Sequence, residues 1–195
     1  TATNRVLGQA IPFAGDYGIS QNPESLASDQ YRLYFADTQR GAVLRLSRDG
    51  LTPISNVGMK TWFRENISKI RPNTLLGTFD GVNGEYNLTL KYGNNSGYNN
   101  KTISFNEASK GWVSFKSFIP TKGVYISGKY YTSNSGRIYE HYSDNVDYNT
   151  FYGDMVDSYI DVVFNEIPSV VKSFRTLNYE GSQARVTQNT EDDQY

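Results

Sequence analysis

The 195-residue sequence contains no cysteine. This absence excludes disulfides, thiolate metal sites and cysteine nucleophiles, and it is typical of a protein that folds in a reducing cytosol. The sequence also lacks any apolar run near the ~18 residues that a membrane-spanning helix needs. No apolar segment follows Arg5, so the N-terminus has no secretion-signal pattern. We therefore expect no membrane span.

Catalytic groups are almost as scarce. His141 is the only histidine, and a single histidine on a strand is usually a satisfied structural residue. The sequence has no HExxH, P-loop, Rossmann glycine or nucleophile-elbow pattern. Carboxylates remain as candidates for a glycosidase pair, and the candidates in this chain are Asp80, Glu85, Asp154, Asp157 and Asp161. Any β-rich chain with 20 acidic residues offers such candidates, so the signal is weak. We expect no enzyme activity, no catalytic residue, no cofactor and no metal site.

Two weaker patterns are candidate binding sites. The acidic loop with Asp144, Asp147 and Asn149 fails the EF-hand spacing, because it lacks the required glycine and the final glutamate. Asx-turns that close a loop explain it better. Trp62 and Trp112 could form a sugar platform, but Trp112 stands in an alternating strand pattern, where an inward-facing core position is favoured.

An excess of charge of one sign is also missing. The chain has 19 Lys and Arg against 20 Asp and Glu, so its net charge gives no support for non-specific binding to duplex DNA. A basic stripe along a channel is still compatible with this balance, because net charge does not say how charge is distributed.

What the sequence has is a repeated hairpin pattern. Residues 35–46, 78–90 and 130–142 each contain a strand, a turn marked by Asp or Asn and glycine, and a second strand. The recurrence of about 45 residues is close to the length of a four-stranded propeller blade. Gly84, which follows Asn83, should adopt a positive φ. The pattern predicts a mostly β fold of antiparallel, propeller-like hairpin repeats that forms part of a larger β domain.

Other segments complete this expectation. Residues 58–70 predict one inserted helix, with Met59, Trp62, Phe63 and Ile67 near one face and Pro72 beyond its end. Pro53 predicts a strand edge or an exit of the chain from the sheet. Strands should outweigh helix by at least two to one. We further expect strands at 158–167 and 175–179 and a short helical turn at 168–174. The expected organisation is a loop-rich lead-in (1–30), a partial propeller-like β domain (31–182) and a disordered tail (183–195).

The joint order of several segments resembles the tail muzzle or nozzle-type virion structural protein of crAss-like and related tailed bacteriophages. The segments that carry the resemblance are GAVLRLSRDGLTPIS (41–55), GMKTWF (58–63), LLGTFDGVNGEYNLTL (75–90), TISFNEASKGWVSFKSF (102–118), SGRIYEHYSDN (135–145), YNTFYG (148–153) and VVFNEIPSVVKSFRTLNYEGS (162–182). The family protein is far longer than this chain, which we therefore interpret as a fragment. The resemblance implies a propeller-like β domain in a ring at the end of a short tail, and it implies no catalytic residue.

This resemblance leads to a functional hypothesis. We expect a non-enzymatic structural protein of the phage tail that helps form or close the DNA exit channel, located in the virion and folded in the bacterial host cytoplasm. Its expected partners are copies of itself or the rest of its parent chain, other tail proteins, and transiently the phage DNA. Two alternatives stay open. One is an adhesion module that binds host glycan through aromatic loops at 93–100 and 143–153, and the other is a carboxylate-based glycan-cleaving tail enzyme.

Overall fold

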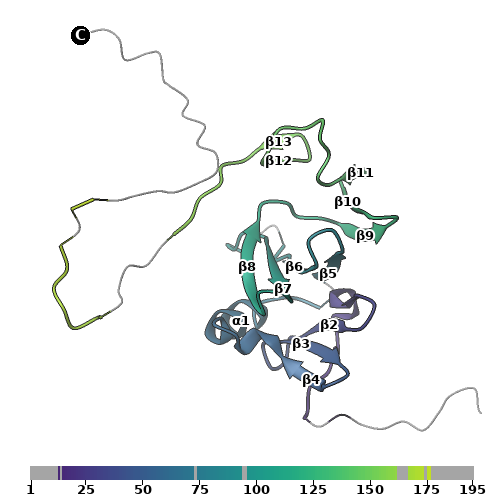
Figure 1. Ribbon diagram of the computed structural model, residues 1–195. Coiled ribbons are helices and arrows are strands. Elements are labelled where there is room, and N and C mark those ends of the chain that lie inside the picture. Colours follow the sequence, from purple (N-terminus) through teal and green to yellow (C-terminus); the bar gives the residue numbers. More distant parts are fainter. Residues whose placement is uncertain are drawn as a thin grey trace, which may run out of the picture. The chain divides into compact units, whose positions relative to one another are not determined.

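The computed structural model describes residues 13, 15–72, 74–93, 96–161, 167–173, 175 and 176. In this part of the chain, strands make up 39% and helices 9% of the residues. The predicted mostly β class and its two-to-one excess of strand are therefore confirmed. The chain divides into two units, residues 1–158 and 159–195, and every element labelled in Figure 1 belongs to the first. Within the described ranges, no helix is long and apolar enough to cross a membrane.

Three antiparallel sheets follow one another along the chain. The first contains β1 (Ala27–Ser28), β2 (Leu33–Asp37), β3 (Ala42–Ser47) and β4 (Gly50–Pro53) in that order. The second contains β5 (Leu75–Asp80), β6 (Glu85–Leu90), β7 (Lys101–Asn106) and β8 (Gly111–Lys116). The third contains β9 (Lys122–Ile126), β10 (Lys129–Asn134) and β11 (Arg137–Glu140). A separate hairpin pairs β12 (Thr150–Phe151) with β13 (Asp154–Met155).

The three predicted hairpins are confirmed as β2–β3, β5–β6 and β10–β11. Pro53 ends β4 at the edge of the first sheet, as its missing N–H requires. No sheet in the described residues closes into a barrel, and a propeller is not shown. Each sheet is a simple meander, because each strand pairs with the next one along the chain.

Three hairpin turns are built in the same way, with a capping Asp or Asn side chain followed by a residue at positive φ. Asp37 accepts hydrogen bonds from the N–H groups of residues 39 and 40, and Gly41 closes the turn with φ +61°. Asp80 caps residues 82 and 83 in the same way, and Gly84 has φ +65°. Asn106 caps Ser109, and Lys110 has φ +50°. The positive φ predicted for Gly84 is confirmed, although it closes a four-residue loop capped by Asp80 rather than a two-residue turn.

The helix α1 (Lys60–Ile67) lies inside the predicted range 58–70. Its buried residues are Phe63 and Ile67, one turn apart on the same face, while Met59 and Trp62 are partly buried against the same core. Two 3₁₀ turns, η1 (Pro23–Ser25) and η2 (Ile54–Asn56), flank the first sheet. α1 contacts β3 and η2, and so fills the corner where the chain passes from the first sheet to the second (Figure 1).

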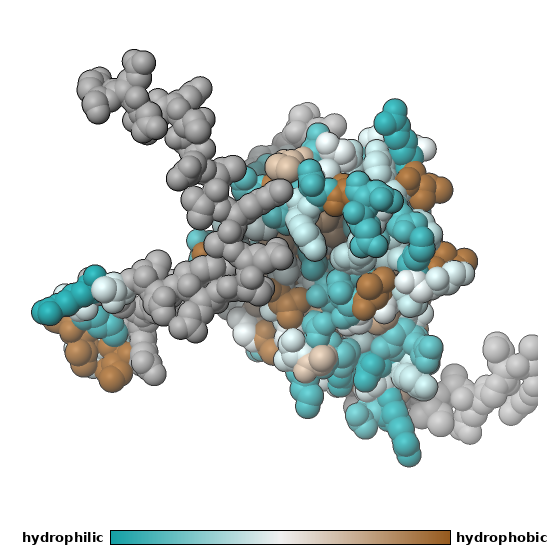
Figure 2. All heavy atoms as spheres, turned by 45° about the horizontal axis from the view of Figure 1, so that its top comes forward, coloured by the Kyte–Doolittle hydropathy of each residue, from teal (hydrophilic) through white to brown (hydrophobic). Residues whose placement is uncertain are grey.

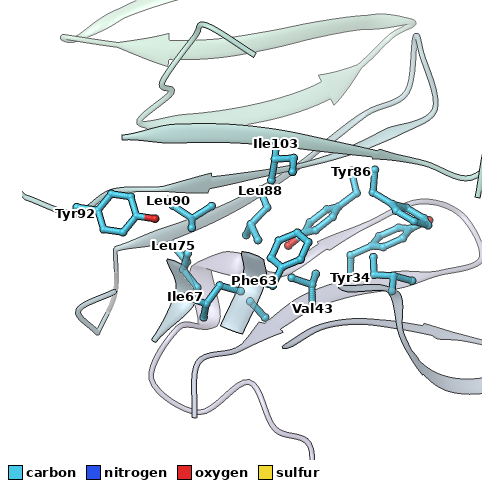
Figure 3. Packing of buried hydrophobic residues seen from close by; sticks show 13 residues of the cluster. Tyr34, Val43, Phe63, Ile67, Leu75, Tyr86, Leu88, Leu90, Tyr92 and Ile103 are labelled. Atoms are coloured by element: carbon cyan, nitrogen blue, oxygen red, sulfur yellow. The ribbon is translucent and has the colours of Figure 1, made fainter. Parts of the chain in front are cut away.

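The main core lies between the first and second sheets (Figure 3). Tyr34 of β2 stacks on Tyr86 of β6 with ring centroids 4.9 Å apart. Val43, Phe63 and Leu88 are completely buried in the same cluster. Burial of each such aliphatic or aromatic side chain contributes about 1.5–3 kcal/mol, so this layer holds the two sheets face to face.

Two predicted strands and one predicted helical turn are not found in the described residues. Residues 158–161 and 167 are not in a strand, and residues 162–166 lie outside the described part. Residues 167–170 form a turn closed by the N–H of Val170 on the carbonyl of Ile167, 3.2 Å apart, instead of a helix. Residues 175 and 176 are not in a strand, and the range 183–195 lies outside the described residues. Apolar alternation gives a strand tendency, but a strand also needs a partner for its backbone hydrogen bonds.

Candidate functional site

The layer between the second and third sheets is polar, and we treat it as the candidate site. Alternate residues of β5, β6 and β7 point away from the main core, and the polar ones at the centre of this face are Thr78, Asn87, Thr89, Thr102 and Ser104. Each is at most 2% exposed. Buried hydroxyl and amide groups need hydrogen-bond partners. The hydroxyls of Thr89 and Thr102 bond to each other, and Thr102 also donates to the carbonyl of Phe118, whereas Thr78 and Asn87 have a partner in the third sheet.

Tyr130 of β10 provides the central contact. Its hydroxyl lies 2.8 Å from the Thr78 hydroxyl and accepts a hydrogen bond from the Asn87 side-chain amide at 3.4 Å. The Asn87 carbonyl oxygen accepts a hydrogen bond from the Ser104 hydroxyl. Burial raises the pKa of the Tyr130 hydroxyl, which stays protonated. One tyrosine of the third sheet therefore contacts two strands of the second, and Asn87 extends the hydrogen-bond network to Ser104 on the next strand.

Two glycines allow the sheets to approach each other closely. A Cβ on Gly123 of β9 would lie 2.7 Å from Cγ2 of Thr78. A Cβ on Gly81 would overlap the ring of Tyr125. Only residues without a side chain fit at such distances. Glycine thus brings β9 against β5, and the geometry of the polar layer depends on this close approach.

His141 lies beside this layer. Its Nε2 is 2.7 Å from the hydroxyl of Thr132, which is itself 2.8 Å from the hydroxyl of Tyr152. The imidazole packs against Phe118 and Tyr130 at centroid distances of 4.7 and 4.8 Å. Burial lowers the pKa of His141; Asp80 opposes this effect and Lys116 adds to it. The predicted structural role of His141 agrees with these contacts, because a neutral imidazole completes the hydrogen bonding of Thr132.

Of the candidate carboxylates, only Asp80 and Glu85 are opposite each other, as the closing pair of β5–β6. Asp80 is buried and accepts hydrogen bonds from the N–H of Val82, from Asn83 and from the hydroxyl of Tyr142. Glu85 forms an ion pair with Lys116, with N and O 3.0 Å apart. Both groups thus have structural partners. Asp154, Asp157 and Asp161 are exposed.

The two tryptophans serve the core. Trp112 packs on Phe63 and Phe105, with centroid distances of 4.4 and 5.4 Å, and donates its indole N–H to the carbonyl of Ile54 at 3.1 Å. Trp62 packs on Phe63 at 4.9 Å. The predicted core position of Trp112 is confirmed. Neither indole forms a flat exposed platform for a sugar, because both rings contact other aromatic side chains.

The two aromatic loops, 93–100 and 143–153, differ in how open they are. In the loop 93–100, Tyr98 packs on Tyr92 with ring centroids 5.4 Å apart and lies under the Lys69 ammonium. Residues 94 and 95 lie outside the described part. The second loop, 143–153, borders a cavity of about 640 Å³ lined by residues 139–144 and 146–153, and its Tyr148 is 94% exposed. This second loop is the more open of the two.

The acidic loop is closed by its backbone. The N–H of Val146 donates to the carbonyl of Ser143, and the N–H of Thr150 donates to that of Asp147, at 3.4 and 3.3 Å. Asp144, Asp147 and Asn149 are all exposed. Within the described ranges, no group of three or more histidine or acidic side chains is arranged to hold a metal ion.

A groove lies where the first strands of the three sheets come together. β1, β5 and β9 are neighbours in space, and the groove of about 690 Å³ between them is lined by residues 26–31, 77–79, 81 and 123–125. A Cβ on Gly77 would overlap the carbonyl of Ser25, so glycine again permits the approach. The groove has aromatic walls, and its acidic residue Asp29 is paired with Arg32 at 2.8 Å.

Sequence reasoning missed the polar layer and the Asp80–Tyr142 contact. A signal was present, because Thr and Asn alternate with Leu and Tyr at 86–90. Such alternation normally predicts that one face of the strand packs on the core and the other is exposed to solvent. Burial of that second face depends on residues 118–152, far along the chain, and no local pattern reports it.

With this geometry established, comparison with family models gives a match. The model described as the crassvirus muzzle protein C-terminal domain matches residues 146–194, roughly the last quarter of the chain. The resemblance to a crassvirus tail muzzle-type protein is thereby confirmed. Among curated proteins, no match is found.

Proposed function

From this match to the muzzle family, we propose that the chain is a non-enzymatic structural protein of the phage tail, of muzzle or nozzle type, that helps form or close the DNA exit channel. The family match supports the coarser part, a structural role in the virion tail with other phage structural proteins as partners. The finer part rests on one observation: the first strands of three successive meanders lie side by side around a groove.

This arrangement supports a partial propeller. In propellers, meander sheets pack face to face and their first strands surround a central channel. Here the second sheet, drawn between the other two in Figure 1, packs on the first through its apolar face and on the third through its polar face. Three sheets cannot close a ring. Further sheets come from copies of this chain or from the rest of its parent chain, with assembly in the virion after folding in the host cytoplasm.

The groove supports a channel-wall role. Its carboxylate is paired with an arginine, and the chain as a whole is almost neutral. A wall of this kind attracts the DNA phosphates only weakly, because tight binding requires unpaired cations. DNA would contact it transiently during ejection, which is what an exit channel needs.

Proteomics of purified virions and immunogold labelling with an antibody against the chain test this proposal. The expected result is a stoichiometric virion protein with gold at the tail end. A host cytoplasmic protein serves as the carry-over control. A chain that is missing from virions, or is labelled on the capsid, contradicts the proposal.

An adhesion module is the second candidate, and the exposed Tyr148 beside the cavity of residues 139–153 favours it. A glycan array of host capsular and cell-wall sugars tests it, with Tyr148→Ala as the variant and Tyr31→Ala, an exposed tyrosine of the groove, as the control. Binding lost only in the first variant would support adhesion. Incubation with the same glycans tests the glycan-cleaving alternative, for which Asp80→Asn and Glu85→Gln are the diagnostic variants.

A further inference from the structure

The cavity of about 640 Å³ lined by residues 139–144 and 146–153 has walls rich in aromatic rings. The ring centroid of His141 lies 6.4 Å from those of Phe151 and Tyr152. The ring of Tyr139 packs on that of Tyr152 at 4.6 Å, and Tyr148, which also lines the cavity, is exposed. Ligand pockets commonly have volumes of about 300–1,000 Å³, so this cavity has room for one amino-acid side chain or a small molecule.

The charge around this cavity is negative. Residues 139–153 contain the carboxylates Glu140, Asp144 and Asp147 and no lysine or arginine. Glu140 is paired with Lys129 at 2.7 Å, but in the described part of the chain no ion pair includes Asp144 or Asp147. His141 adds no positive charge near neutral pH, because burial lowers its pKa. Two carboxylates beside the aromatic rings are thus left without a basic partner among the described residues.

Elsewhere, aromatic rings of this chain are covered by its own lysines. The Lys69 ammonium lies 4.7 Å from the ring centroid of Tyr98, and that of Lys101 lies 5.6 Å from the ring of Trp62. Within the described ranges, no ring of residues 139–153 has such a contact. The face of an aromatic ring attracts a cation, and a nearby carboxylate adds to this attraction. The cavity therefore has the chemistry of a site for an ammonium or guanidinium group that this part of the chain does not itself supply.

Resting on the proposed role beside other tail proteins, we propose that this cavity binds the cationic side chain, lysine or arginine, of a neighbouring phage structural protein. The family match makes such proteins the expected partners. Figure 2, which brings the upper part of Figure 1 forward, shows a mostly hydrophilic surface with scattered hydrophobic patches, and such a surface suits a charged ligand. A neutral sugar, the ligand of the adhesion candidate, would contact the aromatic rings without needing Asp144 and Asp147. Dependence on charge therefore separates the two ligands.

Titration of the full chain with Nα-acetyl-lysine amide and Nα-acetyl-arginine amide measures the binding, with NMR shifts of the backbone amides as the readout. At least one of the two cations should shift the amides of residues 139–153, and added salt should weaken its binding because it screens exposed charges. The neutral isostere Nα-acetyl-norleucine amide should not bind. Binding of neither cation, or equal binding of the isostere, overturns the proposal. Tighter binding of glucosamine than of both amides would point to an amino sugar and also overturn it.

Variants locate the site. Asp144→Asn, Asp147→Asn and Tyr148→Ala should each raise the Kd of the cation by about 2- to 5-fold, as expected for single contacts at exposed positions. Asp49→Asn and Tyr31→Ala change exposed residues that do not line the cavity and are the matched controls, with an unchanged Kd. Circular dichroism checks that each variant is folded. An unchanged Kd in all three cavity variants contradicts the proposed site.

A map of the intact particle identifies the partner. The expected result is a lysine or arginine side chain of a neighbouring virion protein inside the cavity, beside Asp144 or Asp147. A cavity that opens to solvent in the particle, or that holds a neutral group, overturns the proposal. Such results leave the tail assignment intact, because that assignment depends on whether the chain is present in the virion tail.

Discussion

The hydroxyl of Tyr130 lies 2.8 Å from the hydroxyl of Thr78, and this contact joins the third sheet to the second. Both residues are buried, and Gly123 permits their close approach. The consequence is a stack with two kinds of layer. The layer between the first and second sheets is held by apolar burial, whereas the layer between the second and third sheets depends on satisfied hydrogen bonds.

We expect Tyr130→Phe to lower the free energy of unfolding by about 1–3 kcal/mol, because Thr78 and Asn87 lose a buried partner. Urea denaturation measures the change. The double variant Tyr130→Phe with Thr78→Val should lose less stability than the sum of the losses in the two single variants. Additive costs would mean that the two hydroxyls do not interact.

The turn at Gly84 gives a second prediction. Gly84 has φ +65° with open space around it, so the cost of a side chain there is conformational rather than steric. Gly84→Val should reduce stability by about 1 kcal/mol or more. Gly84→Asn is the matched control and should cost less, since asparagine tolerates this region. Equal denaturation midpoints for wild type and Gly84→Val would contradict the observed turn.

Substitution of Trp112 distinguishes a structural role of its indole in the core from a role as a sugar-binding platform. Trp112→Ala should cost about 3 kcal/mol in a thermal or urea unfolding experiment, because it removes packing on Phe63 and Phe105. Tyr148→Ala, at a position 94% exposed, should change stability by less than about 0.5 kcal/mol. A small effect of Trp112→Ala would contradict the core role of the indole.

The free energy of unfolding should decrease in acid because of His141, which packs beside the third sheet. Burial holds the pKa of His141 below its usual value of 6.5, so the unfolded chain binds a proton more readily than the folded one. The stability that His141 contributes is therefore complete above that value and is lost as the pH falls below it. Asp80 and Lys116 face this histidine, and both remain in the variant His141→Gln.

The measurement is the difference in unfolding free energy between wild type and His141→Gln at about pH 8 and about pH 5. Wild type should lose more stability than the variant over this interval. Parallel curves would mean that His141 titrates alike in the folded and unfolded chains.

Local turn chemistry made much of the fold predictable. The Asp37–Gly41 and Asp80–Gly84 turns combine a capping carboxylate with a glycine at positive φ, and both signals are visible in the sequence. The helix was found because Phe63 and Ile67 repeat with its period. The strand predictions at 158–167 and 175–179 show the limit of this reasoning where the chain is described, since residues 158–161, 167, 175 and 176 are not in a strand. An apolar segment does not by itself contain its partner strand.

The candidate site was much less predictable. Thr78 and Asn87 look like solvent-facing strand residues, and their burial requires Tyr130, some 40 to 50 residues further on. In the tight turn at Tyr152 and Gly153, glycine suits its positive φ of +96°, but tyrosine at φ +58° follows no local preference. The contact from Tyr152 to Thr132 accompanies it, so tertiary structure decides this part of the chain.

A cryo-EM map of the intact phage particle tests the proposed place of this chain in the tail. The three sheets should fit density at the distal end of the tail, with β1, β5 and β9 facing a channel on the tail axis. Density for this chain on the capsid, in a fibre away from the axis, or with these first strands facing solvent would contradict it.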